Sequence, residues 1–257
     1  MDPKNKAFTS IKEVPEATWK KLSEKRIYFG HQSVGYNIID GVKDVMKENP
    51  KINLNIVETN KPADHKGPIF AHSPMGQNFN SKSKCEDFEA VVRQNMGEKA
   101  DIDFFKFCFV DFDDKTDVNA VFEEYKKVLA GLKHKYPQTV FIHVTVPLTT
   151  PPPGFKATVK QFIKQLIGRP IMRLEDNISA EEFNEKLRKE YAGKEALFDL
   201  AKVESTAPDG TRAVFQKGGK VYNSMVPAYT DDGGHLNETG RKVVAEQLLI
   251  FLANLSN

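Results

Sequence analysis

The sequence predicts an α/β protein, a doubly wound three-layer α/β/α sandwich with about five mostly parallel strands. Two observations support this fold class. Short apolar segments alternate five times with amphipathic helical segments along the 257 residues. The apolar segments are continuous rather than alternating, which is typical of parallel strands covered by helices on both faces. Because the sequence shows no repeat, low-complexity tract or linker, we expect residues 1–257 to form a single domain.

The first half of the chain supplies three predicted strands and two helices. KRIYFG (25–30) indicates a buried strand, and the spacing of apolar residues that follows predicts a helix over 34–48. INLNIVET (52–59) predicts the second strand, and a helix is expected over 84–95. The aromatic run FFKFCFV (104–110) predicts the third strand.

The second half continues the alternation. Ser179 and Glu182 match a capping box, which predicts that a helix starts there and runs to residue 191. The proline loop TTPPPG (149–154) is expected to stiffen the rim of a site. The other predicted elements are a helix over 117–135, strands over 139–148 and 196–204, and a final helix over 237–254.

Composition excludes several classes of partner. The net charge is only +2 and no basic stripe stands out, so nucleic acid is not an expected partner. No apolar run approaches the roughly 18 residues of a membrane-spanning helix. The polar start, MDPKNKAFTS, lacks the apolar core of a signal peptide. We expect a soluble protein, either cytoplasmic or exported with its leader removed, and the sequence leaves its oligomeric state open.

The cysteines and glycines point to no metal or cofactor. Cys108 lies in an apolar run and is expected to be a reduced core residue, although a disulfide with Cys85 stays open. The sequence contains no CxxC or HExxH spacing and no glycine loop of the kind that cradles phosphates. We therefore expect neither a metal site nor a nucleotide cofactor.

In open parallel sheets, ligands bind beyond the carboxyl ends of the strands, so residues that follow strands are the candidates. GHQSVG (30–35) places Ser33 between the first strand and the first helix. A serine there lies near free N–H groups and the positive end of the helix dipole, as a nucleophile would. Serine is also a preferred N-cap residue, so a purely capping role stays open.

A second segment, YTDDGGHLNETG (229–240), precedes the final helix. Its glycines would let the Asp232 carboxylate reach the His235 imidazole and fix the tautomer of the ring. The other ring nitrogen could then take a proton from a hydroxyl. The alternative is that both are ordinary loop residues and that Asn237 caps the helix.

Together, these two segments resemble the SGNH (GDSL-type) hydrolases. The resemblance covers most of the chain through the order of its elements, and its motifs lie near the two ends. It implies a flavodoxin-like sandwich with esterase or lipase-like chemistry, often on acetylated carbohydrates. It also implies that Ser33 is the nucleophile, His235 the general base and Asp232 the acid that orients the base.

The same resemblance suggests the groups that bind the oxyanion or the substrate. HSPMGQN makes Gly76 the candidate for the family's oxyanion glycine, with Asn78 nearby. The family's Gly-x-Asn-Asp after the third strand is absent, and Asp111 stands in that region instead. His31 could line the pocket or donate to substrate, and a structural turn residue is the other interpretation.

Three further polar residues lie in or after strands. Lys106 interrupts the third strand and is expected to pair with a carboxylate such as Asp111 or Asp113, or to lie near the end of the strand. A structural ion pair is favoured there over a catalytic lysine. His143 is expected to be a satisfied core histidine, whereas His72 could be a core residue or reach the pocket.

Two functions remain from the sequence. The first is a serine hydrolase that cleaves an ester through an acyl-enzyme, with an O-acyl (acetyl) group on a carbohydrate or small polar acceptor as substrate. The alternative is a non-catalytic carbohydrate- or ligand-binding module on the same fold.

Overall fold

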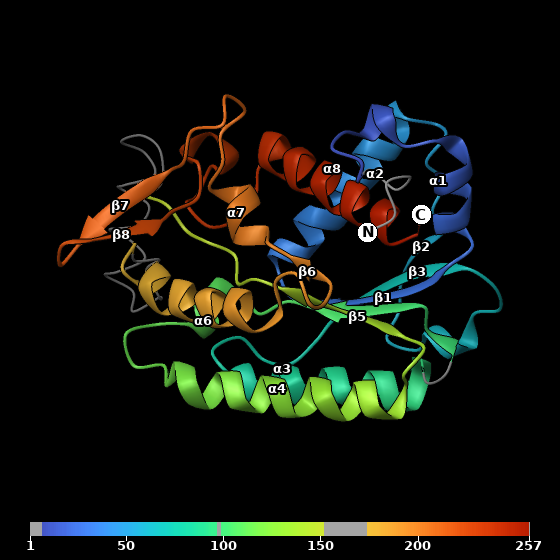
Figure 1. The fold of residues 1–257 in the computed structure, drawn as a ribbon, viewed down its shortest axis with the longest axis horizontal. Helices are drawn as coiled ribbons and strands as arrows, with labels where there is room; N and C mark the ends of the chain where they lie inside the picture. The colour runs from blue at the N-terminus through green and yellow to red at the C-terminus, as the bar shows by residue number, and fades with distance from the viewer. Residues whose placement is uncertain (1–6, 97–98, 152–173, 257) are drawn as a thin grey trace.

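A computed structural model describes residues 7–96, 99–151 and 174–256, and the statements below concern those residues. Its centre is a six-stranded parallel sheet in the order β2-β3-β1-β4-β5-β6 (Figure 1). The strands are β1 (Arg26–His31), β2 (Ile56–Glu58), β3 (Ile69–Pro74), β4 (Ile102–Phe105), β5 (Val140–Val144) and β6 (Leu197–Phe198).

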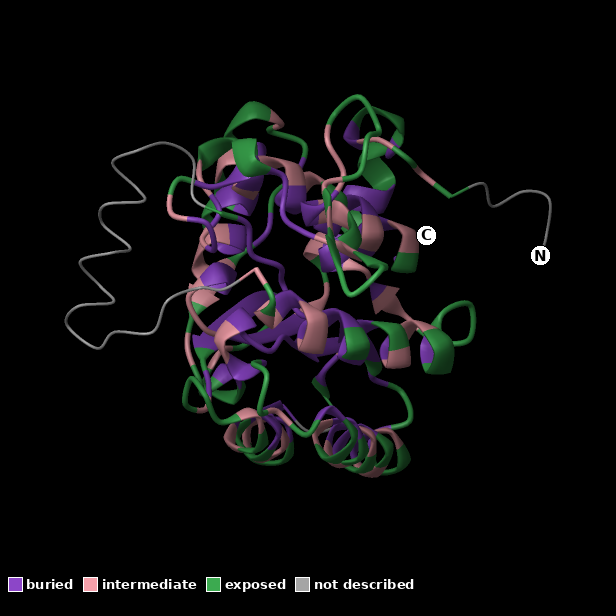
Figure 2. Cartoon of the chain, turned by 90° about the vertical axis from the view of Figure 1, so that its left-hand side faces the viewer, coloured by how far each residue is buried: buried purple, intermediate pink, exposed green. Residues whose placement is uncertain are grey.

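Helices cover both faces of the sheet, which confirms the predicted three-layer sandwich. One apolar core packs beneath α1, α2 and α8, and the other packs against α3, α4 and α6 (Figure 1). Figure 2 shows the strands buried between the two helix layers. The helices are α1 (Glu16–Ser23), α2 (Val34–Glu48), α3 (Ser81–Val91), α4 (Val118–Lys135), α6 (Asp176–Tyr191), α7 (Leu200–Glu204) and α8 (Glu238–Leu255).

The sheet contains a strand that the sequence pattern did not predict. β3 lies between β2 and β1 and pairs with β1 from Arg26↔Ile69 to His31↔Pro74. The sequence marks β3 with only three apolar residues (69–71), which a polar pair follows and Pro68 and Pro74 flank. The local propensity for a β-strand is therefore weak there. Pairing on both sides and burial stabilise it instead. The predicted strand over 52–59 shortens to the edge strand β2.

Two predicted boundaries in the second half are wrong. The strand expected over 196–204 ends at Phe198, because the Asp199 side chain accepts a hydrogen bond from the Lys202 N–H and starts α7. Ser179 does not open a helix, since α6 begins at Asp176 and the Ser179 hydroxyl donates to the Asp113 carbonyl at 2.7 Å. An unpredicted hairpin of β7 (Val214–Lys217) and β8 (Lys220–Asn223) follows α7. Of the proline loop, residues 152–154 lie outside the described residues.

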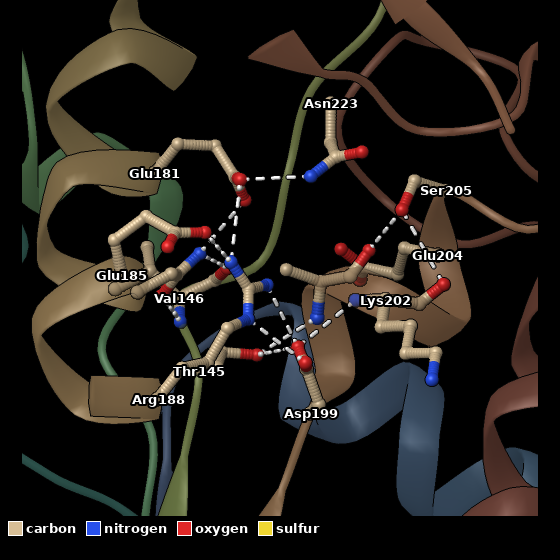
Figure 3. A network of polar contacts seen from close by, with 12 residues as sticks. Thr145, Val146, Glu181, Glu185, Arg188, Asp199, Lys202, Glu204, Ser205 and Asn223 are labelled. Carbon is tan, nitrogen blue, oxygen red and sulfur yellow. Dashed lines mark hydrogen bonds and ion pairs between the residues drawn. The ribbon is translucent and has the colours of Figure 1, made fainter. Parts of the chain in front are cut away.

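A polar network fixes α6 and α7 to each other near the carboxyl ends of β5 and β6 (Figure 3). The Arg188 guanidinium donates to both oxygens of Asp199, each at 2.9 Å. Thr145 donates to the same carboxylate at 3.2 Å, and Asn223 of β8 donates to Glu181 of α6 at 2.8 Å. Bidentate pairing of this kind fixes orientation as well as distance.

α2 packs against α8, so a helix from the first part of the chain lies beside the helix from its last part (Figure 1). A Cβ at Gly41 would lie 2.2 Å from the Arg241 carbonyl oxygen, so only glycine allows this close approach. Arg241 also pairs with Asp44 at 2.6 Å. The N-termini of both helices therefore lie on neighbouring parts of the molecule. Within the described ranges, no helix is both long and apolar enough to cross a membrane.

Candidate active site

Ser33 lies between β1 and α2, as predicted, but its side chain does not cap the helix. The Ser33 hydroxyl lies 3.6 Å from the Cys108 sulfur and makes no hydrogen bond to another described group. Its backbone N–H also has no partner among the described residues. The hydroxyl and the N–H are thus both available to a ligand at a helix N-terminus.

Asp232 and His235 form the predicted pair. Asp232 Oδ2 lies 2.8 Å from His235 Nδ1, and its other oxygen accepts the N–H groups of Gly234 at 3.0 Å and His235 at 2.8 Å. Partial burial tends to raise the pKa of Asp232, but the hydrogen bonds from the His235 ring and from the two N–H groups outweigh burial and lower it. The ionised carboxylate can only accept, so Nδ1 carries the proton and Nε2 is the free base.

Three contacts hold the His235 loop against the strand ends. The Leu236 N–H donates to the Asn37 side chain at 3.2 Å, one turn beyond Ser33 on α2. The Thr150 N–H donates to the Gly233 carbonyl at 2.8 Å. The His235 ring packs edge-on against Phe109, with centroids 5.7 Å apart. The structure thus brings the two predicted loops to one edge of the sheet.

Ser33 and His235 border the same short segment, Cys108–Phe109, without a hydrogen bond between them. The Ser33 hydroxyl faces Cys108, and the part-exposed His235 ring makes its only described side-chain hydrogen bond to Asp232. Nucleophile–base hydrogen bonds are often long before substrate binds. Catalysis by this pair would require the Ser33 hydroxyl and His235 Nε2 to come within hydrogen-bond distance.

The two predicted oxyanion residues differ in what they can donate. The Gly76 N–H already donates to the Asp87 carboxylate at 2.7 Å. Glycine is needed at this position because its φ is +57° and because a Cβ there would lie 2.7 Å from the backbone nitrogen of Lys84. Asn78 is exposed, and its side-chain oxygen accepts from Lys84 at 3.1 Å. Its NH₂ group has no partner among the described residues, so Asn78 has a free donor and Gly76 has none.

His31 is fully buried beneath the site. Its Nε2 lies 3.0 Å from His72 Nδ1, and its ring packs against Tyr36. Burial, followed by the charge of Lys106, lowers the pKa of His31 to about 2, so the ring is neutral. His72 is buried too, and this arrangement favours the structural interpretation of both histidines over direct contact with a substrate.

A buried ion pair beside the site was not expected from the sequence. Lys84 donates to Asp111 at 2.5 Å, and neither side chain is exposed. Asp111 also accepts the N–H groups of Cys108 at 2.7 Å and Phe79 at 3.0 Å. The carboxylate therefore connects the loop after β3 to the loop after β4. One feature of the sequence could have indicated this pair. Lys84 lies four residues before Phe88 and therefore on the apolar face of α3, where a lysine needs a buried partner.

The ion pair expected of Lys106 does not form, because Asp111 is held by Lys84. Lys106 instead follows directly after the end of β4, which was the other placement expected. Lys106 is buried, its ammonium donates to the Phe107 carbonyl at 3.2 Å, and it has no ion pair within the described part of the chain. Burial lowers its pKa. The charges of the buried carboxyl groups of Asp111 and Glu204 act against this lowering of the pKa.

The buried carboxyl of Glu204 should make the free energy of unfolding depend on pH. Burial raises its pKa to about 8, against the opposing effects of the Leu148 N–H and Lys106. Because the folded state holds this proton and the unfolded state releases it near pH 4.3, stability falls as the pH rises between these values. Glu204→Gln should remove this loss and gain roughly 3–4 kcal/mol over the wild type between pH 5 and pH 8. Urea unfolding of the wild type and of Glu204→Gln at pH 5 and pH 8 measures this difference, with the exposed Glu190→Gln as control. If the stability of both proteins changed equally with pH, the raised pKa of Glu204 would be contradicted.

Two structural expectations are confirmed. His143 is buried, with hydrogen bonds to Tyr125 at 2.7 Å and Glu195 at 2.9 Å. Cys85 and Cys108 are both free and buried. Asn237 caps α8 by accepting the Gly240 N–H at 3.0 Å, so the loop that holds His235 also starts this helix.

No family model matches this sequence, and no curated protein matches it. Among solved structures, it is similar to a protein from Streptococcus pneumonia named for platelet activating factor, at 13% identity and a TM-score of 0.51 over 94% of each chain. It is also similar to a lipolytic G-D-S-L family member from Veillonella parvula, at 16% identity and a TM-score of 0.47 over 87% of this chain and 94% of that one. A third is the periplasmic domain of a lipopolysaccharide acetyltransferase from Salmonella ser. Paratyphi A, at 9% identity and a TM-score of 0.45, covering 93% and 88%.

At these identities the likeness is one of fold. The flavodoxin-like three-layer sandwich that the resemblance implied is confirmed.

Proposed function

We propose that this protein is a serine hydrolase that cleaves an O-acyl ester, such as an acetyl ester, on a carbohydrate or another small polar acceptor. The observation that carries the proposal is the Asp232–His235 hydrogen bond of 2.8 Å in a loop tied to α2 one turn from Ser33. The Ser33 hydroxyl, which does not cap its helix, supports the same interpretation.

In the proposed reaction, His235 Nε2 takes the proton of the Ser33 hydroxyl as Oγ attacks the ester carbonyl carbon. The tetrahedral intermediate collapses when the C–O bond to the acceptor breaks, and His235 returns the proton to the departing alcohol. Water, deprotonated by His235, then attacks the acyl carbon; the bond to Ser33 Oγ breaks, His235 returns the proton to Oγ, and the acid leaves. Asp232 stays ionised and stabilises the imidazolium in each half of the cycle.

Two donors are free to stabilise the oxyanion, the Ser33 N–H and the Asn78 amide. The Gly76 N–H could join them only after it leaves Asp87. This proposal therefore assigns Asn78 the larger share and gives Gly76 the role of shaping the loop.

A second candidate function is the non-catalytic ligand-binding module. It is favoured by the missing hydrogen bond between Ser33 and His235 and by the occupied Gly76 N–H. Both features would be expected in a protein that has this fold but does not catalyse hydrolysis.

Rapid mixing with p-nitrophenyl acetate separates the two candidates. The hydrolase proposal expects a burst of p-nitrophenolate of about one equivalent per protein molecule, followed by slower steady turnover, because the acyl-enzyme accumulates. The mass of the intact protein should rise by one acetyl group during the burst. The absence of both a burst and steady turnover would contradict the proposal and favour the binding module.

A further inference from the structure

The loop that follows β3 presents an aromatic ring to solvent. Phe79 is 62% exposed, although most large apolar side chains of the described residues are buried. The ring stacks on no other aromatic ring of the described chain. An isolated exposed apolar side chain is ordinary, so exposure alone assigns no role.

The backbone at Phe79 is unusual for this residue type. Its φ of +65° lies in the left-handed region, where no other described non-glycine residue is found. Phe79 occupies the third position of a four-residue turn closed by the Asn80 N–H and the Gln77 carbonyl at 3.3 Å. Glycine or asparagine normally fills such a position, since a β-carbon makes the left-handed region costly. Asparagine stands on both sides of Phe79, yet phenylalanine holds the strained position.

The rest of the structure holds the turn in place. The Phe79 N–H donates to Asp111, whose other oxygen accepts the N–H of Cys108. The Cys108 sulfur in turn lies 3.6 Å from the Ser33 hydroxyl. Gln32, next to Ser33, donates to the carbonyls of Met75 and Gly76 at 2.9 Å each. A strained residue that its surroundings fix beside a candidate active site indicates a function for its side chain.

The chemistry around the ring distinguishes between possible ligands. The side chains of Gln77, Asn78 and Asn80 are exposed amides, and no charged residue lies between positions 75 and 80. The NH₂ groups of Asn78 and Asn80 have no partner among the described residues, because only their oxygens are used, by Lys84 and Ser83. An acyl chain or lipid would gain little from such neighbours. A sugar would bind to both the ring and the amides, because its C–H face packs on an aromatic ring and its hydroxyls form hydrogen bonds with amides.

We infer that the turn Gln77–Asn80 is a sugar-binding platform on which Phe79 stacks against a pyranose ring of the acceptor. This inference deepens the proposed function, on which it rests, by naming a carbohydrate as the acceptor that carries the ester. Phe79 contacts substrate here without taking part in proton transfer.

The test measures binding in a protein that cannot turn over, so it does not depend on Ser33 being the nucleophile. In a Ser33→Ala background, NMR titration with O-acetylated xylotetraose compares Phe79, Phe79→Tyr and Phe79→Ala. We expect Phe79→Ala to weaken binding about 5- to 10-fold and Phe79→Tyr to bind within about 2-fold of the parent, because the ring is kept. Equal affinities for all three, or no binding by the parent, would overturn the platform.

Two further arms make the outcome specific. Octanoate serves as the acyl probe, and a loss of octanoate binding in Phe79→Ala with unchanged xylotetraose binding would overturn the inference in favour of an acyl-chain contact. Phe79→Gly should keep the Tm or raise it by about 2–4 °C, since glycine adopts the positive φ freely. A fall in Tm would make the ring a packing element and contradict the role proposed for its strain.

Discussion

Ser33→Ala is expected to lower kcat/KM for p-nitrophenyl acetate by about 10³-fold or more. The reason is that the hydroxyl is the group that forms the covalent bond, and the remaining N–H donors accelerate the reaction only weakly without it. His235→Ala should have a similar effect, and the double variant should be no worse than either single one, because the two side chains act as a unit. Steady-state kinetics at pH 8 measure these values, and a variant that keeps most of its activity would remove Ser33 from the mechanism.

The same substitution tests the capping alternative. Loss of a true serine N-cap costs about 1 kcal/mol, but the Ser33 side chain accepts no helix N–H, so Ser33→Ala should unfold in urea within about 0.5 kcal/mol of the wild type. Ser23→Ala is a matched control, since this exposed hydroxyl lies on α1 and donates only to Lys20. A clear loss of stability with unchanged activity would show that Ser33 only starts the helix.

The largest effect on stability is expected at the Lys84–Asp111 pair. Lys84→Met should lower the free energy of unfolding by about 3–5 kcal/mol, because it leaves a buried carboxylate without its counter-charge. Asp111→Asn should cost a similar amount for the reverse reason. Since the residues share one interaction, the double variant should lose less than the sum of the two single losses.

Lys82→Met provides the control for this cycle. Lys82 lies two residues away on the same helix, and its pair with Glu86 at 3.6 Å is largely exposed, so its loss should change stability by at most about 0.5 kcal/mol. Urea unfolding of the four proteins and the wild type gives the coupling energy. Equal effects of Lys82→Met and Lys84→Met, or strictly additive losses in the cycle, would contradict the role assigned to the buried pair.

Short sequence patterns were enough to predict the sandwich and the Asp232–His235 pair. The apolar runs of β1 and β5 are continuous because both faces are covered, and this feature is visible without pairing information. Asp232 reaches His235 within one turn, and its Oδ1 closes the turn by accepting the N–H groups of Gly234 and His235. Local hydrogen bonding of this kind can be predicted from residue order alone.

Features that depend on long-range contacts were not predictable. β3 is stabilised by its neighbours in the sheet rather than by its own short apolar run. Asp111 was matched to Lys106, five residues away, whereas its partner Lys84 lies 27 residues away on α3. The Gly76 N–H meets Asp87 of the same helix, which no motif around the glycine indicates. In each case the deciding partner lies on another element, and one sequence does not show which elements meet.

Labelling with a fluorophosphonate tests most directly whether the hydroxyl of Ser33 is activated by the His235–Asp232 pair. The wild type should incorporate one equivalent of probe at neutral pH, and peptide mass spectrometry should locate the phosphonyl group on Ser33. His235→Ala should label at least about 10²-fold more slowly. An unlabelled wild type, or a label on another serine that persists in His235→Ala, would contradict the account.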